Sequence, residues 1–350
     1  MNILTAVYIL QHILALLLLS TKKAMRSVFA AFSLVFISII YLLKVDTYDL
    51  YTYTLTVDYP FFFEPGFAYL VYFLSLIFEE NRAVIAFIQF LLAILIFFAS
   101  VRVWNSKYFT KDRNLIYLLV LIIGSIFFTL GVNNAIRQCF AGSFLILALV
   151  YTSEKKYFIS LLFTFFAFMF HFSSIFLSAI MYIMWFMIII MNKTNIQINS
   201  IISRIIALLF FTVISIISYY TLYQLADFAG YSNYFGRSIG VGGEGTRTGI
   251  VSKVVSVFFY FCLSETLIKS IAFKNNLFRF IFLLRYFFIA FLAVLAIFQE
   301  NELGSRILYY YFLIELLSMI CLFKLKHNLP GIVIFLFYGF ALNAWNIIQI

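Results

Sequence analysis

Charged residues are scarce in this chain, and their scarcity excludes most classes of protein. Only 11% of the 350 residues are Asp, Glu, Lys or Arg, whereas 65% are hydrophobic. A soluble globular domain usually carries about 25% charged residues and about 45–50% apolar ones. A water-soluble fold of this length cannot bury so much apolar surface. The composition therefore excludes a soluble enzyme.

Proline and cysteine are also rare. With three prolines and 14 glycines, the chain is neither collagen-like nor a disordered low-complexity protein. Its three cysteines, Cys139, Cys262 and Cys321, lie in or beside apolar runs with no second cysteine nearby. This spacing predicts neither a disulfide framework nor a metal site. We expect these cysteines to pack as small hydrophobic residues.

Long apolar runs are abundant, and they continue for roughly 15–20 residues without the alternation that is typical of β-barrel strands. The segments are 3–20, 27–43, 83–101, 115–131, 138–152, 157–170, 172–191, 205–223, 250–264, 280–298, 307–323 and 331–348. They predict an all-α polytopic membrane protein with about twelve transmembrane helices in one integral membrane domain over 1–350. The first segment has neither a basic start nor a cleavage site, so we expect a retained span.

A further apolar run, 66–78, has thirteen residues. At 1.5 Å per residue it covers about 20 Å, which is less than the roughly 30 Å hydrocarbon core. We therefore expect it to lie along the outer surface. If this segment is not counted as a membrane span, basic and acidic loops alternate along the chain. The acidic loops include 44–82 and 299–306.

The formal net charge of +10 follows from this alternation. Cytoplasmic loops of membrane proteins collect Lys and Arg, so the basic loops are predicted inside and both termini outside. The charge therefore does not indicate a nucleic-acid partner. The longest outer loops, 44–65 and 224–249, are too short for an independent core.

Four outer segments collect unusual polar residues. The first, 46–67, carries Asp46, Tyr48, Asp49 and Glu64, and Pro65 follows as a favourable first residue of a helix. Two interpretations stay open for this segment. It is either a capped interfacial helix with an aromatic belt, or a surface on which aromatic rings stack on sugars while carboxylates accept hydroxyl hydrogen bonds.

The second segment places Asn134, Arg137 and Gln138 at the start of an apolar helix. An outer Arg at a helix start opposes both the helix dipole and the charge bias, so we favour a functional role over a simple pair with Glu64. The third is His171, which lies at the only polar break in 157–191. It is either a structural hydrogen-bonding residue or a group for proton transfer or phosphate binding.

The fourth segment places Arg306 and Tyr310 at the start of a late helix. Guanidinium groups bind phosphate bidentately, so Arg137 and Arg306 together suit one anionic ligand. Arg237 and Arg247, in a Gly-rich stretch, are either a mobile clamp or a solvated loop. Arg285 and Glu315 lie inside apolar spans, where packing partners and a polar cavity are both possible interpretations.

These motifs, in this order, resemble a known family. Aspartates and tyrosines before EPGF (64–67), then N-x-x-RQ (134–138), FHFSS (170–174) and R-x-x-YY (306–310) are similar to the Wzy/EpsG type of bacterial polysaccharide polymerase. The resemblance implies a GT-C-like glycosyltransferase in the bacterial cytoplasmic (inner) membrane, with its active site facing the periplasm or exterior. It would polymerise repeat units of an undecaprenyl-diphosphate-linked oligosaccharide.

The resemblance also implies roles for the residues. Arg137 and Arg306 would bind the lipid diphosphate leaving group, and His171 or Glu64 would be the base, a choice that the sequence leaves open. Gln138 and Tyr310 would position sugar or phosphate groups, and the outer loops 44–65 and 224–249 would bind the substrate and select the repeat unit. No cofactor or metal is expected, and the expected partners are the lipid-linked oligosaccharide, membrane lipids and a chain-length regulator. The alternatives are a flippase for the same lipid, an O-antigen ligase and an assembly subunit of an export complex.

Overall fold

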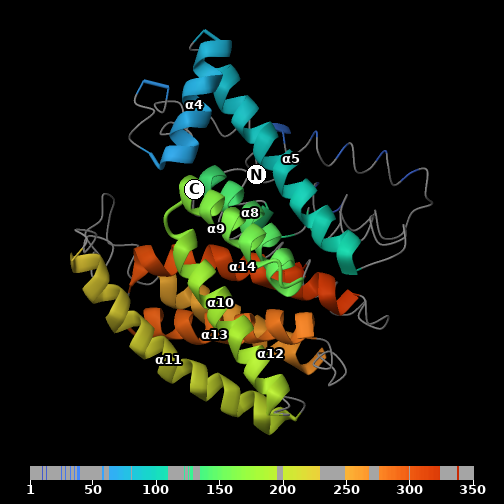
Figure 1. Ribbon diagram of the computed structural model, residues 1–350, viewed down its shortest axis with the longest axis vertical. Coiled ribbons are helices and arrows are strands. Elements are labelled where there is room, and N and C mark those ends of the chain that lie inside the picture. The colour runs from blue at the N-terminus through green and yellow to red at the C-terminus, as the bar shows by residue number, and fades with distance from the viewer. Residues whose placement is uncertain are drawn as a thin grey trace. The chain divides into compact units, whose positions relative to one another are not determined.

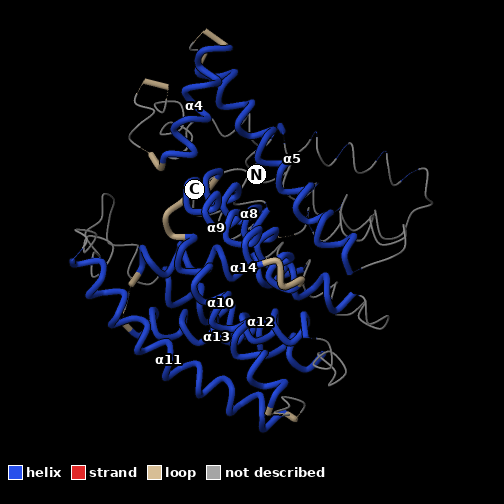
Figure 2. Tube along the Cα trace, viewed as in Figure 1, coloured by secondary structure: helices blue, strands red, loops and turns tan. Residues whose placement is uncertain are grey.

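The structure is a computed structural model of the whole chain. It describes residues 63–79, 81–108, 135–194, 200–228, 249–267, 276–298 and 300–323, together with a few positions outside these ranges. Every regular element in these ranges is an α-helix (Figures 1 and 2). The all-α prediction is therefore confirmed for the described part of the chain.

The described helices are α4 (Pro65–Ile77), α5 (Arg82–Tyr108), α8 (Ile136–Ser153), α9 (Tyr157–Phe170), α10 (Ser174–Lys193), α11 (Ile201–Phe228), α12 (Gly249–Leu267), α13 (Asn276–Ile297) and α14 (Asn301–Phe323). Among the residues described, six helices are long and apolar enough to cross a membrane: α5, α8, α10, α11, α13 and α14. This result supports a multi-pass helical membrane protein.

The break at His171 is confirmed, because the chain turns there between α9 and α10. The run 66–78 corresponds to the short helix α4, of 13 residues, and its position along the outer surface stays a prediction. The segment 157–170 is helical as predicted, but α9 has only 14 residues. That length covers about 21 Å, so α9, like α4, falls short of a full span.

The prediction of an outer loop over 299–306 is wrong. Helix α14 already begins at Asn301, and the backbone N–H of Gly304 donates to the carbonyl oxygen of Glu300 at 2.8 Å. An acidic residue suits the positive end of a helix, so the polar residues of this segment start a helix and do not form a loop. Arg306 consequently lies in the second turn of α14, whereas the sequence predicted that the helix begins at Arg306.

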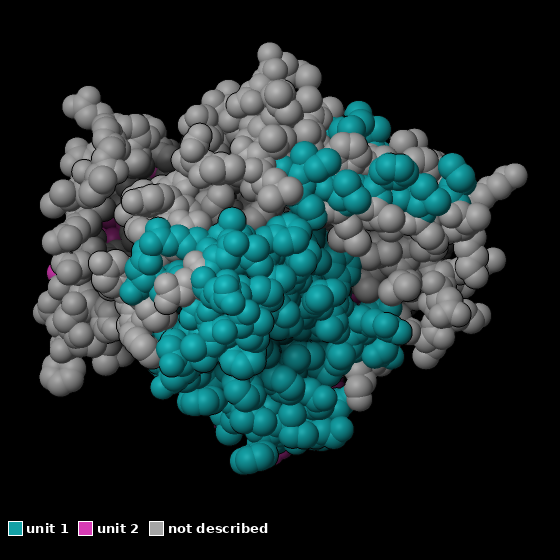
Figure 3. Space-filling model, turned by 90° about the horizontal axis from the view of Figure 1, so that it is seen from above, with its two compact units in different colours: residues 1–179, 332–350 teal, residues 180–331 magenta. Residues whose placement is uncertain are grey.

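The chain divides into two compact units, which Figure 3 shows in different colours. The first comprises residues 1–179 and 332–350, and the second comprises residues 180–331. In the first unit α8 packs on both α5 and α9. In the second unit α13 packs against α11, α12 and α14 and is buried along most of its length.

The first unit is organised around a hairpin of α8 and α9. Lys155 turns the chain between them with a left-handed φ of 62°. The hydroxyls of Thr152 and Ser160 hydrogen-bond across the two helices at 2.7 Å, and the rings of Phe140 and Phe170 stack at the other end with centroids 4.9 Å apart. The hairpin therefore fixes the start of α8 beside the end of α9.

Candidate active site

Three helix ends of the first unit meet at one place. Glu64 directly precedes Pro65 at the start of α4, Arg137 and Gln138 lie in the first turn of α8, and His171 is the residue that ends α9. Pro at the first helical position needs no hydrogen-bond partner for its nitrogen, so it favours a helix start directly after Glu64. The four side chains come from three separate motifs of the sequence.

Gly66 allows α4 to approach α9 closely. A Cβ atom at this position would lie 2.9 Å from the backbone oxygen of Met169 and 3.0 Å from its carbonyl carbon. Real Cβ atoms do not approach backbone atoms so closely, so only glycine fits without moving the helices apart. This approach explains the glycine of the EPGF motif, because it brings Glu64 to the end of α9, beside His171.

Glu64 bridges His171 and Arg137. Its Oε1 lies 2.7 Å from His171 Nδ1, and its Oε2 accepts a hydrogen bond from the guanidinium of Arg137. On the other side of the imidazole ring, Gln138 Nε2 lies 3.0 Å from His171 Nε2. When Nδ1–H donates to Glu64 and the Gln138 amide donates to Nε2, His171 is a neutral imidazole.

Glu64 and His171 are buried, whereas Arg137 and Gln138 are partly exposed. Glu64 is 6% exposed and His171 is 3% exposed, whereas the Arg137 side chain is 23% exposed. The guanidinium carbon of Arg137 lies 4.7 Å from the centre of the Phe63 ring, which supports the cation on its face. Arg137 is thus more open to an incoming ligand than the buried Glu64–His171 pair.

The surroundings keep Glu64 ionised. Burial by itself raises the pKa of this carboxyl, but the hydrogen bond with His171 and the charge of Arg137 outweigh burial and lower the pKa to about 2. A carboxylate with so low a pKa is a weak base near neutral pH. It is suited to orient His171 and to stabilise a proton on that ring.

The structure describes only some of the other predicted site residues. Arg306 and Tyr310 lie on α14 in the second unit, where Tyr310 is fully buried. The remaining predicted substrate-binding residues fall outside the described ranges; they are Asp46, Tyr48, Asp49, Asn134, Arg237 and Arg247. In the described ranges no three His, Cys, Asp or Glu side chains gather as metal ligands. Metal independence stays a prediction.

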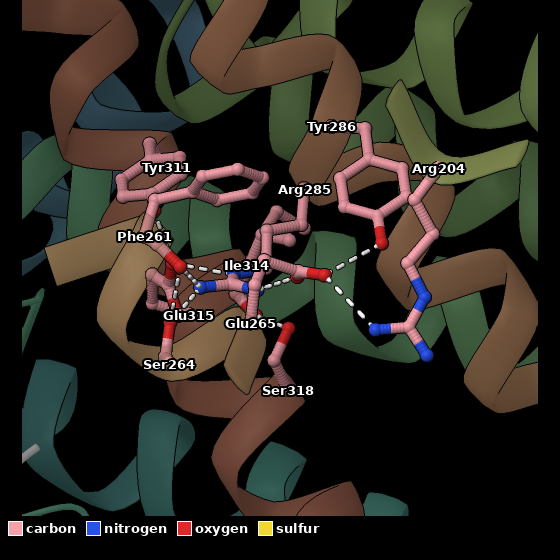
Figure 4. Close-up of polar contacts among 10 residues, drawn as sticks. All are labelled: Arg204, Phe261, Ser264, Glu265, Arg285, Tyr286, Tyr311, Ile314, Glu315 and Ser318. Atoms are coloured by element: carbon pink, nitrogen blue, oxygen red, sulfur yellow. Dashed lines mark hydrogen bonds and ion pairs between the residues drawn. The ribbon is translucent and has the colours of Figure 1, made fainter. Parts of the chain in front are cut away.

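The second unit contains a charged cluster that the sequence reading did not assemble. Arg204, Glu265, Arg285 and Glu315 form a chain of ion pairs across α11, α12, α13 and α14, which we call the Arg285 network (Figure 4). The sequence placed Arg285 and Glu315 inside apolar spans but did not identify their partners. Charged residues in apolar helices need partners, so the charges inside these apolar spans were the sequence signal for such a network.

The fold and the cluster around Glu64 define the class of protein: a helical membrane protein with a buried His–carboxylate pair beside a partly exposed arginine. Residues 27–350 match the model of the EpsG family, so the chain belongs to that family. The resemblance read from the motifs is thereby confirmed. No curated protein and no solved structure matches the chain.

Proposed function

We propose that this protein is a polysaccharide polymerase that joins repeat units carried on undecaprenyl diphosphate. Membership of the EpsG family supports a polysaccharide polymerase in general terms. The observation that carries the proposal is the shared carboxylate of Glu64, which holds a histidine on one oxygen and an arginine on the other. This arrangement provides one group for a proton and one for a leaving diphosphate.

In the proposed reaction His171 is the base. The acceptor hydroxyl of a lipid-linked repeat unit attacks the anomeric carbon of the growing glycan, and its proton passes to His171 Nε2. The bond from the anomeric carbon to the phosphate oxygen breaks, and undecaprenyl diphosphate leaves with the bonding electrons. Glu64 holds the Nδ1–H and stabilises the imidazolium that forms. For this step the Gln138 amide exchanges places with the acceptor hydroxyl at Nε2.

Arg137 is proposed to receive the negative charge of the leaving group. The pair with Glu64 was the structural alternative to this role, and that pair is present. A guanidinium carries its N–H donors in a planar fork that matches phosphate oxygens, and the Arg137 side chain is 23% exposed. Arg306 and Tyr310, on α14, keep their proposed roles in binding phosphate or sugar groups.

The finer architecture belongs to the same proposal. We propose about twelve spans in a GT-C-like arrangement, an outward-facing site in the bacterial inner membrane, and the loops 44–65 and 224–249 as selectors of the repeat unit. A chain-length regulator is a proposed partner. Asp46, Tyr48, Asp49, Asn134, Arg237 and Arg247 keep their proposed roles in substrate binding.

The test is polymerisation by the purified protein in lipid vesicles. Lipid-linked repeat units should yield a ladder of longer lipid-linked glycans without nucleotide sugar and in the presence of a metal chelator. Transfer of the lipid between leaflets without a ladder would support the flippase. Transfer onto a different acceptor lipid would support the ligase. If neither activity is found, the assembly subunit is the alternative that remains.

A further inference from the structure

The Arg285 network joins α11, α12, α13 and α14 in the second unit (Figure 4). Arg285 Nε donates to Glu315 Oε1 at 2.7 Å, and a terminal nitrogen donates to Glu265 Oε1 at 2.5 Å. The other terminal nitrogen donates to the Ser264 hydroxyl, and the guanidinium lies over the Phe261 ring at 4.5 Å. Every nitrogen of this guanidinium therefore has a partner.

The two carboxylates extend the network in opposite directions. Glu265 Oε2 accepts a hydrogen bond from Tyr286 Oη at 2.8 Å and lies 3.5 Å from an Arg204 nitrogen on α11. Glu315 accepts a hydrogen bond from Tyr311 one turn earlier on α14. Two positive and two negative side chains balance, and the Arg285 side chain is completely buried. A balanced network of this kind is a directional contact between helices.

Such a contact matters for α14 because its apolar pattern does not fix its rotation. Apolar residues lie on all sides of this helix, and nearly all of its middle section is buried. A helix that is hydrophobic all round has no preferred face toward its neighbours. In a membrane, burial of apolar side chains also provides no drive for one rotation over another, because lipid is equally apolar.

The helical repeat relates the network to the proposed site residues. Arg306 lies nine residues before Glu315, or about two and a half turns, so the two side chains leave α14 on opposite faces. Tyr310 follows Arg306 by four residues and shares its face, whereas Tyr311 shares the face of Glu315. The ion pair that holds Glu315 toward α13 thus directs Arg306 and Tyr310 away from α13.

We propose that Arg285 and Glu315 are positioning residues that fix the rotation of α14 and so hold Arg306 and Tyr310 in their working direction. The functional half of this inference rests on the proposed polymerase activity. The orientation half does not. Buried ion pairs can often be replaced by apolar residues without loss of stability, and their best-attested use is to specify one arrangement of helices.

The test uses the double substitution Arg285→Met and Glu315→Leu in the full-length protein. It removes one charge of each sign and leaves Glu265 with Arg204 and Tyr286 as partners. The matched control is Ser318→Ala. Ser318 is buried on α14 one turn beyond Glu315, but its hydroxyl donates only to the carbonyl of Ile314 in the same helix.

The native cysteines report the rotation without any need for activity. Cys321 on α14 and Cys139 in the first unit are buried, and Cys262 on α12 is exposed. In the unmodified protein an apolar maleimide should label Cys262 and spare the other two, as followed by mass spectrometry. In the double variant Cys321 should become labelled at least about tenfold faster relative to Cys262, while Cys139 stays protected.

The expected result is a folded double variant with a melting temperature close to that of the unmodified protein, a reactive Cys321 and turnover reduced at least about tenfold. A protected Cys321 would overturn the proposal, and so would loss of the folded protein, because the network would then serve stability. A reactive Cys321 with unchanged turnover would keep the orientation half and remove Arg306 from the site. If the unmodified protein produces no ladder of glycans, the proposed function is overturned, but the orientation half of the inference is not.

Discussion

At the scale of single residues, the Glu64 carboxylate decides the character of the site. One oxygen meets the imidazole of His171 and the other meets the guanidinium of Arg137, so the side chain links two groups that lie 34 residues apart in the sequence. Its lowered pKa makes Glu64 a weak base near neutral pH and suits it to orient the neighbouring ring. The proposed function therefore uses His171 as the base.

The first prediction concerns His171. Replacement by Asn keeps an amide N–H that can reach Glu64 but removes the ring nitrogen that accepts a proton. Turnover in the ladder assay should fall by about 10²- to 10⁴-fold, the usual contribution of a general base. His327→Asn is the matched control, since that residue lies in a basic segment and not in a site motif. Equal loss in both variants would contradict the assignment.

The second prediction concerns pH and stability. The pKa of Glu64 is lowered from 4.5 to about 2 by folding, so its charge stabilises the folded state above the unfolded pKa. This stabilisation is lost as pH falls from about 5 through 2 and amounts to roughly 3 kcal/mol. Thermal melting in detergent should show a smaller decline over this range in Glu64→Gln than in the unmodified protein. Parallel declines would show that the Glu64 charge makes no such contribution.

At the scale of secondary-structure elements, short helices and tight contacts make the site possible. Helix α4 was predicted as a short run because its apolar residues are too few to span. The break at His171 was predicted because a continuous apolar stretch of that length needs a turn. The start of α14 was missed because Gly304 and nearby polar residues read as a loop, although they occupy the first turn of a helix.

The third prediction concerns the contact between α4 and α9. Gly66→Ala places a methyl group against the Met169 backbone, so the two helices must separate and the Glu64–His171 hydrogen bond should lengthen. Stability should fall by about 1–3 kcal/mol, as for other overpacked contacts, and turnover should fall with it. Ser75→Ala is the control on α4, because its exposed hydroxyl donates only to Tyr72 in the same helix. A melting temperature unchanged by Gly66→Ala would contradict the tight contact.

At the scale of the whole molecule, the distribution of charge predicts the orientation in the membrane. The basic residues after α5 predict that this helix runs from the outer surface to the cytoplasm. With α4 not spanning, the predicted orientation would put the start of α4, and with it Glu64, on the outer side. An outward-facing site therefore depends on this topology.

The fourth prediction tests the topology directly. In a background without native cysteines, Asn81→Cys, just before α5, should react with a membrane-impermeant maleimide added to intact cells. Ser106→Cys, near the end of α5, should react only after the cells are opened. The reverse pattern would place the cluster on the cytoplasmic side and contradict the proposed use of exported lipid-linked units.

The sequence by itself determined the class of this protein and its helical character, and it named the residues that are proposed for the site. Apolar runs and charge bias act locally, so they can be read without knowing which helices are neighbours. The tertiary structure decided the partners. It joined Glu64, Arg137, Gln138 and His171 through the close approach at Gly66, and it assembled the Arg285 network from four helices. These contacts depend on how helices pack, and an apolar helix in lipid carries little sequence information about which face it turns to its neighbours.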